Sequence, residues 1–262
     1  MSPEASIPRR SPAAWALMGF YFERFFRRHL NALRVAKWGF PETATGPLVV
    51  YSNHPAWWDA AVYVLLARHL FGRHECYAPI DAAMLEKYGF FARIGAFGLD
   101  LESRHGAAAF LRTGAAILAR PERALWVTAQ GRFADPRQRP LNLRAGVARL
   151  AERAPGATFL PLAIEYAFWT ERGAEALAAF GPPLHGAELL ALPRPARLAR
   201  LEAGLAQTMD RLAADAMTRE PERFRVLLEG KPGIGGAYDL WRHGRAMLRG
   251  RSFNPAHREP VA

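Results

Sequence analysis

The sequence predicts an α/β fold in which a mixed β-sheet is flanked by helices, within a single domain. Its 262 residues suit one large domain, and a hydrophobic content of 50% is enough for a substantial core. Short apolar runs of strand length alternate along the chain with amphipathic stretches of helical length. No apolar run approaches the roughly 18–20 residues needed to cross a bilayer.

The elements follow a polar, proline-bearing segment at residues 1–12, for which no fixed structure is expected. The predicted strands cover residues 47–52, 75–80, 124–128 and 158–166. The predicted helices cover residues 15–38, 55–70, 82–88, 106–119 and 144–153, and then a stretch at 189–217 that prolines interrupt. The predicted organisation is a tail and amphipathic helix at 1–40, a core domain at 41–220 and a basic C-terminal appendage at 221–262.

The predicted N-terminal helix combines aromatic and basic side chains. At about 100° per residue, one face carries Phe22, Phe25, Phe26 and Leu33, and Arg24, Arg27, Arg28 and Arg34 lie largely to the other side. A basic helix with aromatic residues on its apolar face is suited to lying in a membrane interface. A helix packed on the protein's own core produces the same pattern, and both arrangements can hold at once.

The net charge of +11 favours a polyanionic partner, either nucleic acid or an anionic membrane surface. Only three of the 35 basic residues are lysines, however, and an arginine- and alanine-rich composition can reflect nucleotide bias alone. The aromatic and basic residues concentrate in the amphipathic helix, and no recognised nucleic-acid motif occurs. We therefore expect peripheral contact with an anionic membrane and no nucleic-acid partner.

The one cysteine, Cys76, excludes an intramolecular disulfide and a metal site built from several cysteines, and we expect it to be buried. The N-terminus lacks the layout of a signal peptide, because charge resumes at Glu23 and no small-residue cleavage site follows. We therefore expect a peripheral protein at the cytoplasmic face of the membrane.

A candidate catalytic pair lies directly after the first predicted core strand. His54 closes that strand, Pro55 can occupy the first helical turn, and Asp59 follows just over one turn later. A carboxylate there could reach one imidazole nitrogen, fix the tautomer and leave the other nitrogen free to take a proton. The H-x4-D spacing has little specificity by itself, but strand ends favour site residues in α/β folds. The alternative is that His54 caps the helix and Asp59 is a solvated charge.

The segment Asn53-His54-x4-Asp59 resembles the first motif of the lysophospholipid/glycerol-phosphate acyltransferase family. Three further segments resemble the later motifs of that family in the expected order: residues 95–100 (GAFGLD), 127–132 (VTAQGR) and 159–163 (FLPLA). Together the four segments span residues 48–166, nearly half of the chain. The resemblance implies an acyltransferase domain with His54 and Asp59 as its catalytic residues.

The acceptor-binding positions depart from the family pattern. Leu101 stands where the second motif ends in arginine, with Arg104 three residues later, and Gln130 replaces the glutamate of the third motif. Charged residues at these positions help family members to bind the acceptor, typically its phosphate. We therefore expect an acceptor other than glycerol 3-phosphate, namely a hydroxyl of a lysolipid, a glycolipid or another lipid-like alcohol.

Five residues are expected to bind substrate: Asn53, Arg104, Gln130, Gly131 and Arg132. Gln130 can hydrogen-bond a hydroxyl without carrying charge, and Gly131 permits close backbone approach by a bulky acceptor. Arg104 and Arg132 are candidates to bind any anionic group of the acceptor.

The resemblance implies transfer of a fatty acyl group from acyl-CoA or acyl carrier protein to the acceptor, with no metal and no further cofactor. His54 would remove the hydroxyl proton, and Asp59 would stabilise the imidazolium. The alternatives are a non-catalytic lipid-binding member of the same fold, a classical glycerol-phosphate or lysophosphatidate acyltransferase, and a hydrolase, although no G-x-S-x-G motif occurs. The acceptor, the acyl chain length, the donor carrier and the oligomeric state stay open.

Two aromatic segments have more than one interpretation. Trp57 and Trp58 could line a substrate channel or could simply pack against the core. Residues 235–251 are predicted to form a basic aromatic helix that clamps the mouth of the site, holds the membrane or packs as a C-terminal helix.

Overall fold

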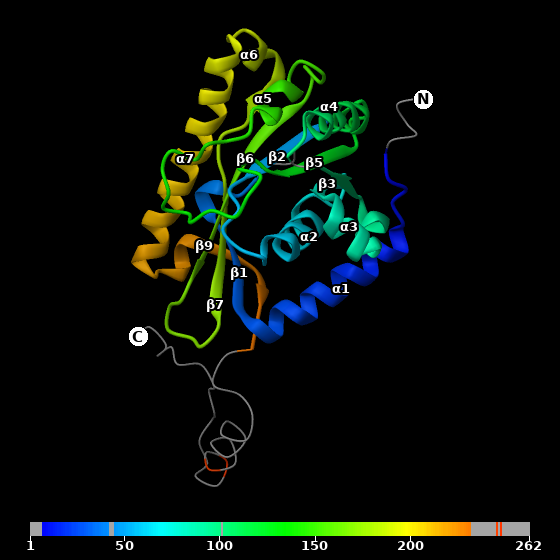
Figure 1. Ribbon diagram of the computed structural model, residues 1–262. Helices are drawn as coiled ribbons and strands as arrows, with labels where there is room; N and C mark the ends of the chain where they lie inside the picture. Colours follow the sequence, from blue (N-terminus) through cyan, green and yellow to red (C-terminus); the bar gives the residue numbers. More distant parts are fainter. Residues whose placement is uncertain (1–6, 42–44, 101, 232–244, 246, 248–262) are drawn as a thin grey trace.

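The computed structural model describes residues 7–41, 45–100, 102–231, 245 and 247, which form one α/β domain (Figure 1). Nine strands among these residues build a single mixed sheet in the order β4-β3-β5-β2-β6-β7-β1-β9, with β8 paired to β6. The strands are β1 (Leu30–Ala36), β2 (Leu48–Ser52), β3 (Glu75–Asp81), β4 (Ala96–Leu99), β5 (Arg123–Thr128), β6 (Thr158–Ala167), β7 (Ala174–Phe180), β8 (Leu184–His185) and β9 (Phe224–Glu229). The predicted mixed sheet flanked by helices is confirmed.

Helices cover both faces of this sheet. The α-helices are α1 (Pro12–His29), α2 (Asp59–Leu70), α3 (Ala82–Lys87), α4 (Arg104–Leu118), α5 (Gly146–Leu150), α6 (Gly186–Leu190) and α7 (Arg194–Thr218). Three short 3-10 helices are η2 (Lys37–Gly39), η3 (Gly89–Ile94) and η4 (Pro221–Arg223). In Figure 1, α1 and α2 lie on one side of the sheet and α7 lies on the other. Within the described part of the chain, no helix is both long and apolar enough to cross a membrane.

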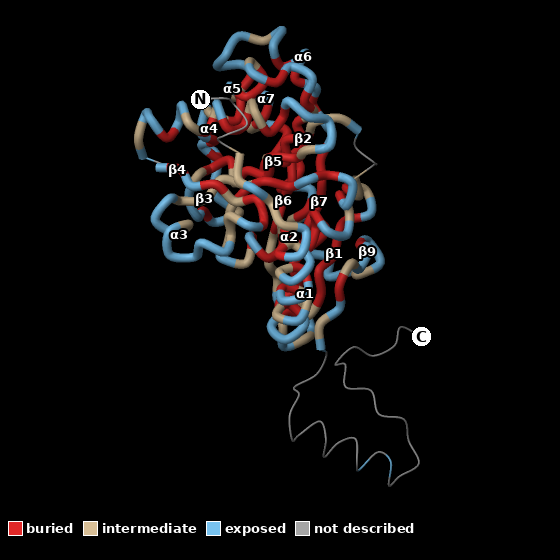
Figure 2. Tube along the Cα trace, turned by 90° about the vertical axis from the view of Figure 1, so that its right-hand side faces the viewer, coloured by how far each residue is buried: buried red, intermediate tan, exposed pale blue. Residues whose placement is uncertain are grey.

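The side chains of β2 alternate between two hydrophobic cores, as the period of a strand requires. Val49 and Tyr51 pack with residues of α4, α5 and α7, and Leu48 and Val50 pack with residues of α1 and α2. Figure 2 shows the buried chain running through the middle strands, with the exposed chain in the helices around them. A strand buried on both faces reads as a continuous apolar run, which is why its prediction from sequence succeeded.

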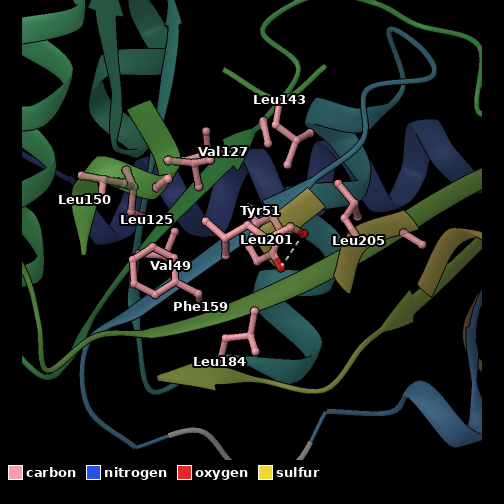
Figure 3. Close-up of a cluster of buried hydrophobic side chains, with 14 of the residues drawn as sticks. Val49, Tyr51, Leu125, Val127, Leu143, Leu150, Phe159, Leu184, Leu201 and Leu205 are labelled. Atoms are coloured by element: carbon pink, nitrogen blue, oxygen red, sulfur yellow. Dashed lines mark hydrogen bonds between the residues drawn. The ribbon is translucent and has the colours of Figure 1, made fainter. Parts of the chain in front are cut away.

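Tyr51 carries a polar atom into the first of these cores. Its phenol donates a hydrogen bond to the Leu201 carbonyl oxygen at 3.2 Å (Figure 3). Burial raises its pKa, so the phenol stays neutral. On the other side of the sheet, Cys76 is buried as expected, and burial raises the pKa of its thiol to about 12.

The strand directions bring several strand ends together. β4, β3, β5, β2 and β6 are parallel, whereas β7 is antiparallel to β6. The carboxyl ends of the five parallel strands therefore share one edge of the sheet. Ligands of open α/β sheets bind in the crevice outside such carboxyl ends.

The predicted helix at residues 15–38 is wrong in its second half. Helix α1 ends at His29, and Leu30–Ala36 forms strand β1 between β7 and β9. Arg34, expected on the polar side of a helix, is buried and pairs with Glu175 of β7 at 2.8 Å. The apolar residues of this segment fit a helical period as well as a strand, and the pairing with distant β7 and β9 decides the outcome.

The segment after residue 221 was expected to be an appendage, but part of it belongs to the sheet. Phe224–Glu229 forms strand β9, which pairs antiparallel with β1. The helix predicted at residues 235–251 lies outside the described residues apart from Arg245 and Met247. The four predicted core strands are confirmed, as are the helices at 82–88 and 106–119. Strands β4, β7 and β8 had no counterpart in the prediction.

Candidate active site

The site residues gather at the carboxyl edge of the parallel strands. His54 is the second residue after β2, Gly131 and Arg132 lie just after β5, and Arg104 begins the helix after β4. Residues on three segments thus reach one edge, although they are spread over almost 80 positions of the chain. The parallel order of these strands is the reason they meet.

His54 and Asp59 form a hydrogen-bonded pair. The distance from His54 Nδ1 to Asp59 Oδ2 is 2.6 Å, the carboxylate is fully buried, and the His54 side chain is 21% exposed. Because a carboxylate only accepts, the hydrogen of this bond is on Nδ1. Nε2 is therefore the unprotonated nitrogen of the neutral ring, and none of the described residues hydrogen-bonds to it.

The backbone between His54 and Asp59 differs from the prediction. Helix α2 begins at Asp59 rather than at residue 55, and Pro55 lies outside the helix. Residues 57 and 58 form a turn that the Asp59 N–H closes on the Ala56 carbonyl oxygen, and Asp59 Oδ2 accepts a hydrogen bond from the Ala56 N–H at 3.2 Å. Asp59 thus occupies the first turn of α2, where the helix dipole stabilises negative charge. The turn folds the carboxylate back toward the imidazole.

A tyrosine that the sequence analysis did not single out completes the site. The Tyr166 phenol, near the end of β6, donates a hydrogen bond to Asp59 Oδ1 at 2.7 Å. Burial and the Asp59 charge both raise the pKa of Tyr166 well above 10, so it remains a neutral donor. Its position at the end of the strand predicted at residues 158–166 was the signal available in the sequence.

Gln130 points into the protein instead of toward a substrate. It is 3% exposed; its Oε1 accepts a hydrogen bond from the His54 backbone N–H at 3.1 Å, and its Nε2 donates to the Leu141 carbonyl oxygen at 3.1 Å. Both ends of the amide are engaged, in place of the expected contact with an acceptor hydroxyl. Gln130 therefore holds the backbone of His54 against the loop that follows β5.

Replacing Gln130 by glutamate tests this contact. A carboxylate can still accept from His54, but it cannot donate to the Leu141 carbonyl oxygen, so the folded state raises its pKa above the unfolded value near 4.3. Gln130→Glu should therefore cost little below about pH 4 and should lose about 1–3 kcal/mol of stability as the pH rises through the folded-state pKa. Urea unfolding between pH 4 and 8 measures this, with exposed Gln138→Glu as the control. A pH-independent difference between the two variants would contradict the assignment.

Asn53 also has a contact within the protein. Its side chain is buried, donates to the Ile164 carbonyl oxygen at 2.8 Å and accepts from the Ile164 N–H at 2.9 Å. The amide therefore continues the ladder between β2 and β6 past the end of β2. The expected substrate contact is replaced by a clamp that fixes the end of β6 beside His54.

The neighbouring Arg144 side chain leaves no room for a Cβ at position 131. Gly131 has a positive φ of 64°, and an added Cβ would collide with the Arg144 side chain. Arg144 pairs with Glu102 at 2.8 Å and so ties this loop to the start of α4. The close approach expected of an acceptor is thus made by Arg144. Arg104 and Arg132 are exposed, and within the described ranges neither has an ion-pair partner.

One aromatic ring contacts the imidazole, and two more belong to the turn that follows His54. The Phe133 ring lies 4.2 Å from the His54 ring between centroids, and its side chain is 59% exposed. Trp58 packs on Phe25 of α1 at 5.1 Å, which agrees with the packing interpretation. Trp57 is 63% exposed, although it also contacts Phe25. The turn between His54 and α2 therefore has an exposed apolar rim.

His54 lies at the carboxyl edge of the sheet, away from two cavities elsewhere in the described part of the chain. A cavity of about 510 Å³ lies at the other end of α2, where Arg10, Trp15 and Arg68 line it. A second cavity of about 240 Å³ lies between α5 and α7. Neither adjoins His54. Within the described residues, no group of His, Cys, Asp and Glu side chains could hold a metal ion.

No protein-family model matches this chain, and no curated protein sequence matches it. The chemistry of the site therefore rests on its own geometry. A histidine with a free Nε2 and a buried carboxylate partner can accept a proton from a bound hydroxyl or water. The pair lacks a neighbouring serine or cysteine in hydrogen-bonding contact among the described residues, so the nucleophile would come from the substrate.

Proposed function

We propose that this protein is an O-acyltransferase of the lysophospholipid/glycerol-phosphate acyltransferase type. It moves a fatty acyl group from acyl-CoA or acyl carrier protein to a hydroxyl of a lysolipid, a glycolipid or another lipid-like acceptor. The observation that carries the proposal is the His54–Asp59 pair, with Nδ1 bound to a buried carboxylate and Nε2 free at the carboxyl edge of the sheet. The four motif-like segments in family order support it.

The proposed reaction follows from the position of the ring hydrogen, which is on Nδ1 and leaves Nε2 able to accept a proton. His54 Nε2 removes the proton of the acceptor hydroxyl while its oxygen attacks the thioester carbonyl carbon. Asp59 stabilises the resulting imidazolium, as the carboxylate of a catalytic triad does. The tetrahedral intermediate then collapses, the C–S bond breaks, and the imidazolium returns the proton to the departing thiolate. The ester and the free thiol are the two products.

The surroundings of His54 favour an apolar substrate. Phe133 follows β5, Trp57 belongs to the turn before α2, and Phe168 follows β6; all three are more than half exposed. Large exposed aromatic side chains from three separate segments at one edge suit a lipid chain. Exposed Arg104 and Arg132 supply positive charge at the same edge for an anionic group of the acceptor or donor.

We further propose that α1 holds the enzyme at the cytoplasmic surface of an anionic membrane. Leu17, Phe20 and Tyr21 are each more than 50% exposed on α1, and exposed arginines follow them in the last two turns. Tyr21 stacks on Phe25 at 5.8 Å, and Phe25 contacts Trp57 at 6.3 Å. This row of rings runs from the outer face of the helix to the catalytic turn, which would bring His54 close to the lipid surface.

Replacing Leu17, Phe20 and Tyr21 together by serine should weaken binding to vesicles that contain anionic lipid by at least about tenfold, because each side chain loses apolar area that the interface would bury. Vesicle flotation measures the bound fraction. Met217→Ser is the matched control, since Met217 is 76% exposed on α7, across the sheet from α1. Equal flotation of the triple variant and the control would contradict the membrane role.

The activity itself is tested with purified protein, acyl-CoA and a lysolipid. Acyl transfer releases a free thiol and an acylated lipid in equal amounts, which a thiol reagent and mass spectrometry measure separately. Thiol release without an acceptor would indicate a hydrolase. Vesicle binding without any thiol release, from acyl-CoA or from acyl carrier protein, would indicate a non-catalytic lipid-binding protein.

A further inference from the structure

We propose that Tyr166 is a positioning residue for the catalytic pair, holding the Asp59 carboxylate in the rotamer that presents Oδ2 to His54. The proposal rests on the proposed function for its catalytic consequence, but its structural part stands on the contacts of Asp59. Those contacts are three hydrogen bonds: two come from the loop between β2 and α2, through the His54 imidazole and the Ala56 backbone, and one comes from the Tyr166 phenol on β6.

The three donors divide between the two carboxylate oxygens. Oδ2 accepts from His54 Nδ1 at 2.6 Å and from Ala56 N at 3.2 Å, whereas Oδ1 accepts only from Tyr166 among the described residues. Both contacts of Oδ2 come from one loop, whereas the bond from Tyr166 holds the opposite oxygen from β6. A donor on each oxygen restrains rotation of the carboxylate about its Cβ–Cγ bond. Asp59 is fully buried, and water cannot replace a missing donor without entering the core.

The position of Tyr166 is itself set by the neighbour of His54. Asn53 pairs with both backbone groups of Ile164 through its side-chain amide. Tyr166 lies two residues further along β6, so its side chain is on the same face of the strand as that of Ile164. Asn53 therefore fixes the position of β6, and with it Tyr166, relative to the adjacent His54. This explains how Tyr166 reaches Asp59, 107 positions away in the chain, beside the local His54–Asp59 pair.

Tyr51 offers a matched control. It is a buried tyrosine on β2, and its phenol, like that of Tyr166, donates one hydrogen bond, here to the Leu201 carbonyl oxygen. Tyr51 packs in the core on the α7 side, away from Asp59. Tyr166→Phe and Tyr51→Phe therefore each delete one buried phenol hydroxyl, but only the first removes a hydrogen bond to the carboxylate.

The test measures solvent exchange of the His54 Nδ1 proton by ¹⁵N-edited NMR on the full chain. Tyr166→Phe should accelerate exchange by about tenfold or more, because a hydrogen bond to a charged group is lost, while Tyr51→Phe should leave it at the wild-type rate. Equal rates in all three proteins would overturn the proposal. If Tyr166→Phe does not fold, 3-fluorotyrosine at position 166 provides the second variant. Its stronger donor should slow the exchange, and an unchanged rate would again overturn the proposal.

An activity measurement separates this inference from the proposed function. In an acyl-transferring enzyme, Tyr166→Phe should lower kcat by about tenfold with KM for the donor within about twofold, because orientation and not binding is lost. The exchange experiment needs no acyl donor. If the wild-type protein transfers no acyl group, the proposed function fails, and the exchange rates still decide whether Tyr166 positions Asp59.

Discussion

Replacing His54 by alanine is expected to abolish acyl transfer while the protein stays folded and still binds membranes. The imidazole is the group in the site with a free basic nitrogen, and general-base catalysis contributes about 10²- to 10⁴-fold to a rate. Its loss also removes the imidazolium that Asp59 would stabilise, although Asp59 keeps its hydrogen bonds from Ala56 and Tyr166. The side chain is partly exposed at the edge of the sheet, so its removal opens no large internal cavity. Thiol release from acyl-CoA with a saturating lysolipid measures the effect.

The control for this variant is another histidine. His185→Ala changes an exposed residue at the opposite, amino end of β6, where the imidazole contacts Thr158. It should retain wild-type turnover. Near-normal turnover by His54→Ala, with the same unfolding midpoint as His185→Ala, would contradict the assignment of His54 as the base.

Asp59→Asn is expected to lower kcat on the order of 10³-fold although the residue keeps its size. The asparagine amide can donate to His54 Nδ1, which places the ring hydrogen on Nε2 instead. Nε2 can then no longer take the acceptor proton, and the imidazolium loses its stabilising charge. Because the change acts on proton transfer, KM for the donor should change little.

The matched control is Asp210→Asn on the exposed face of α7, where the carboxylate pairs with Arg139. It should have wild-type activity, since surface ion pairs contribute little to stability. ¹⁵N shifts of the His54 ring would show which nitrogen carries hydrogen in Asp59→Asn. An unchanged tautomer together with full activity would argue against the proposed role of the carboxylate.

Strands buried on both faces were the most predictable part of the fold. The middle strands β2, β5 and β6 carry near-continuous apolar runs. Amphipathic helical stretches separate these runs, so the alternation of strands and helices is recognisable in the sequence. Strand β7 is different. Its sequence AEALAAF consists mostly of alanine, a poor strand former, and it is a strand because β6 and β1 pair with it on both sides.

The contacts of the expected binding residues were harder to predict than those of the His54–Asp59 pair. Asn53 and Gln130 have side chains that suit a substrate hydroxyl, and the sequence contains no sign that Ile164, His54 and Leu141 occupy them. An amide satisfies a backbone group as readily as a ligand. Which of the two it meets depends on burial, and burial depends on how distant strands are ordered in the sheet.

His54 and Asp59 are five positions apart, and the sequence by itself was sufficient to predict that they pair at the end of a strand. A local turn brings them together, and local geometry is what residue spacing encodes. Tertiary structure alone decided that Tyr166 binds the other carboxylate oxygen, that Gln130 faces inward and that α1 gives way to a strand after His29. Each of these depends on which strands become neighbours in the sheet, and the free energy that selects that order is shared among contacts far apart in the chain.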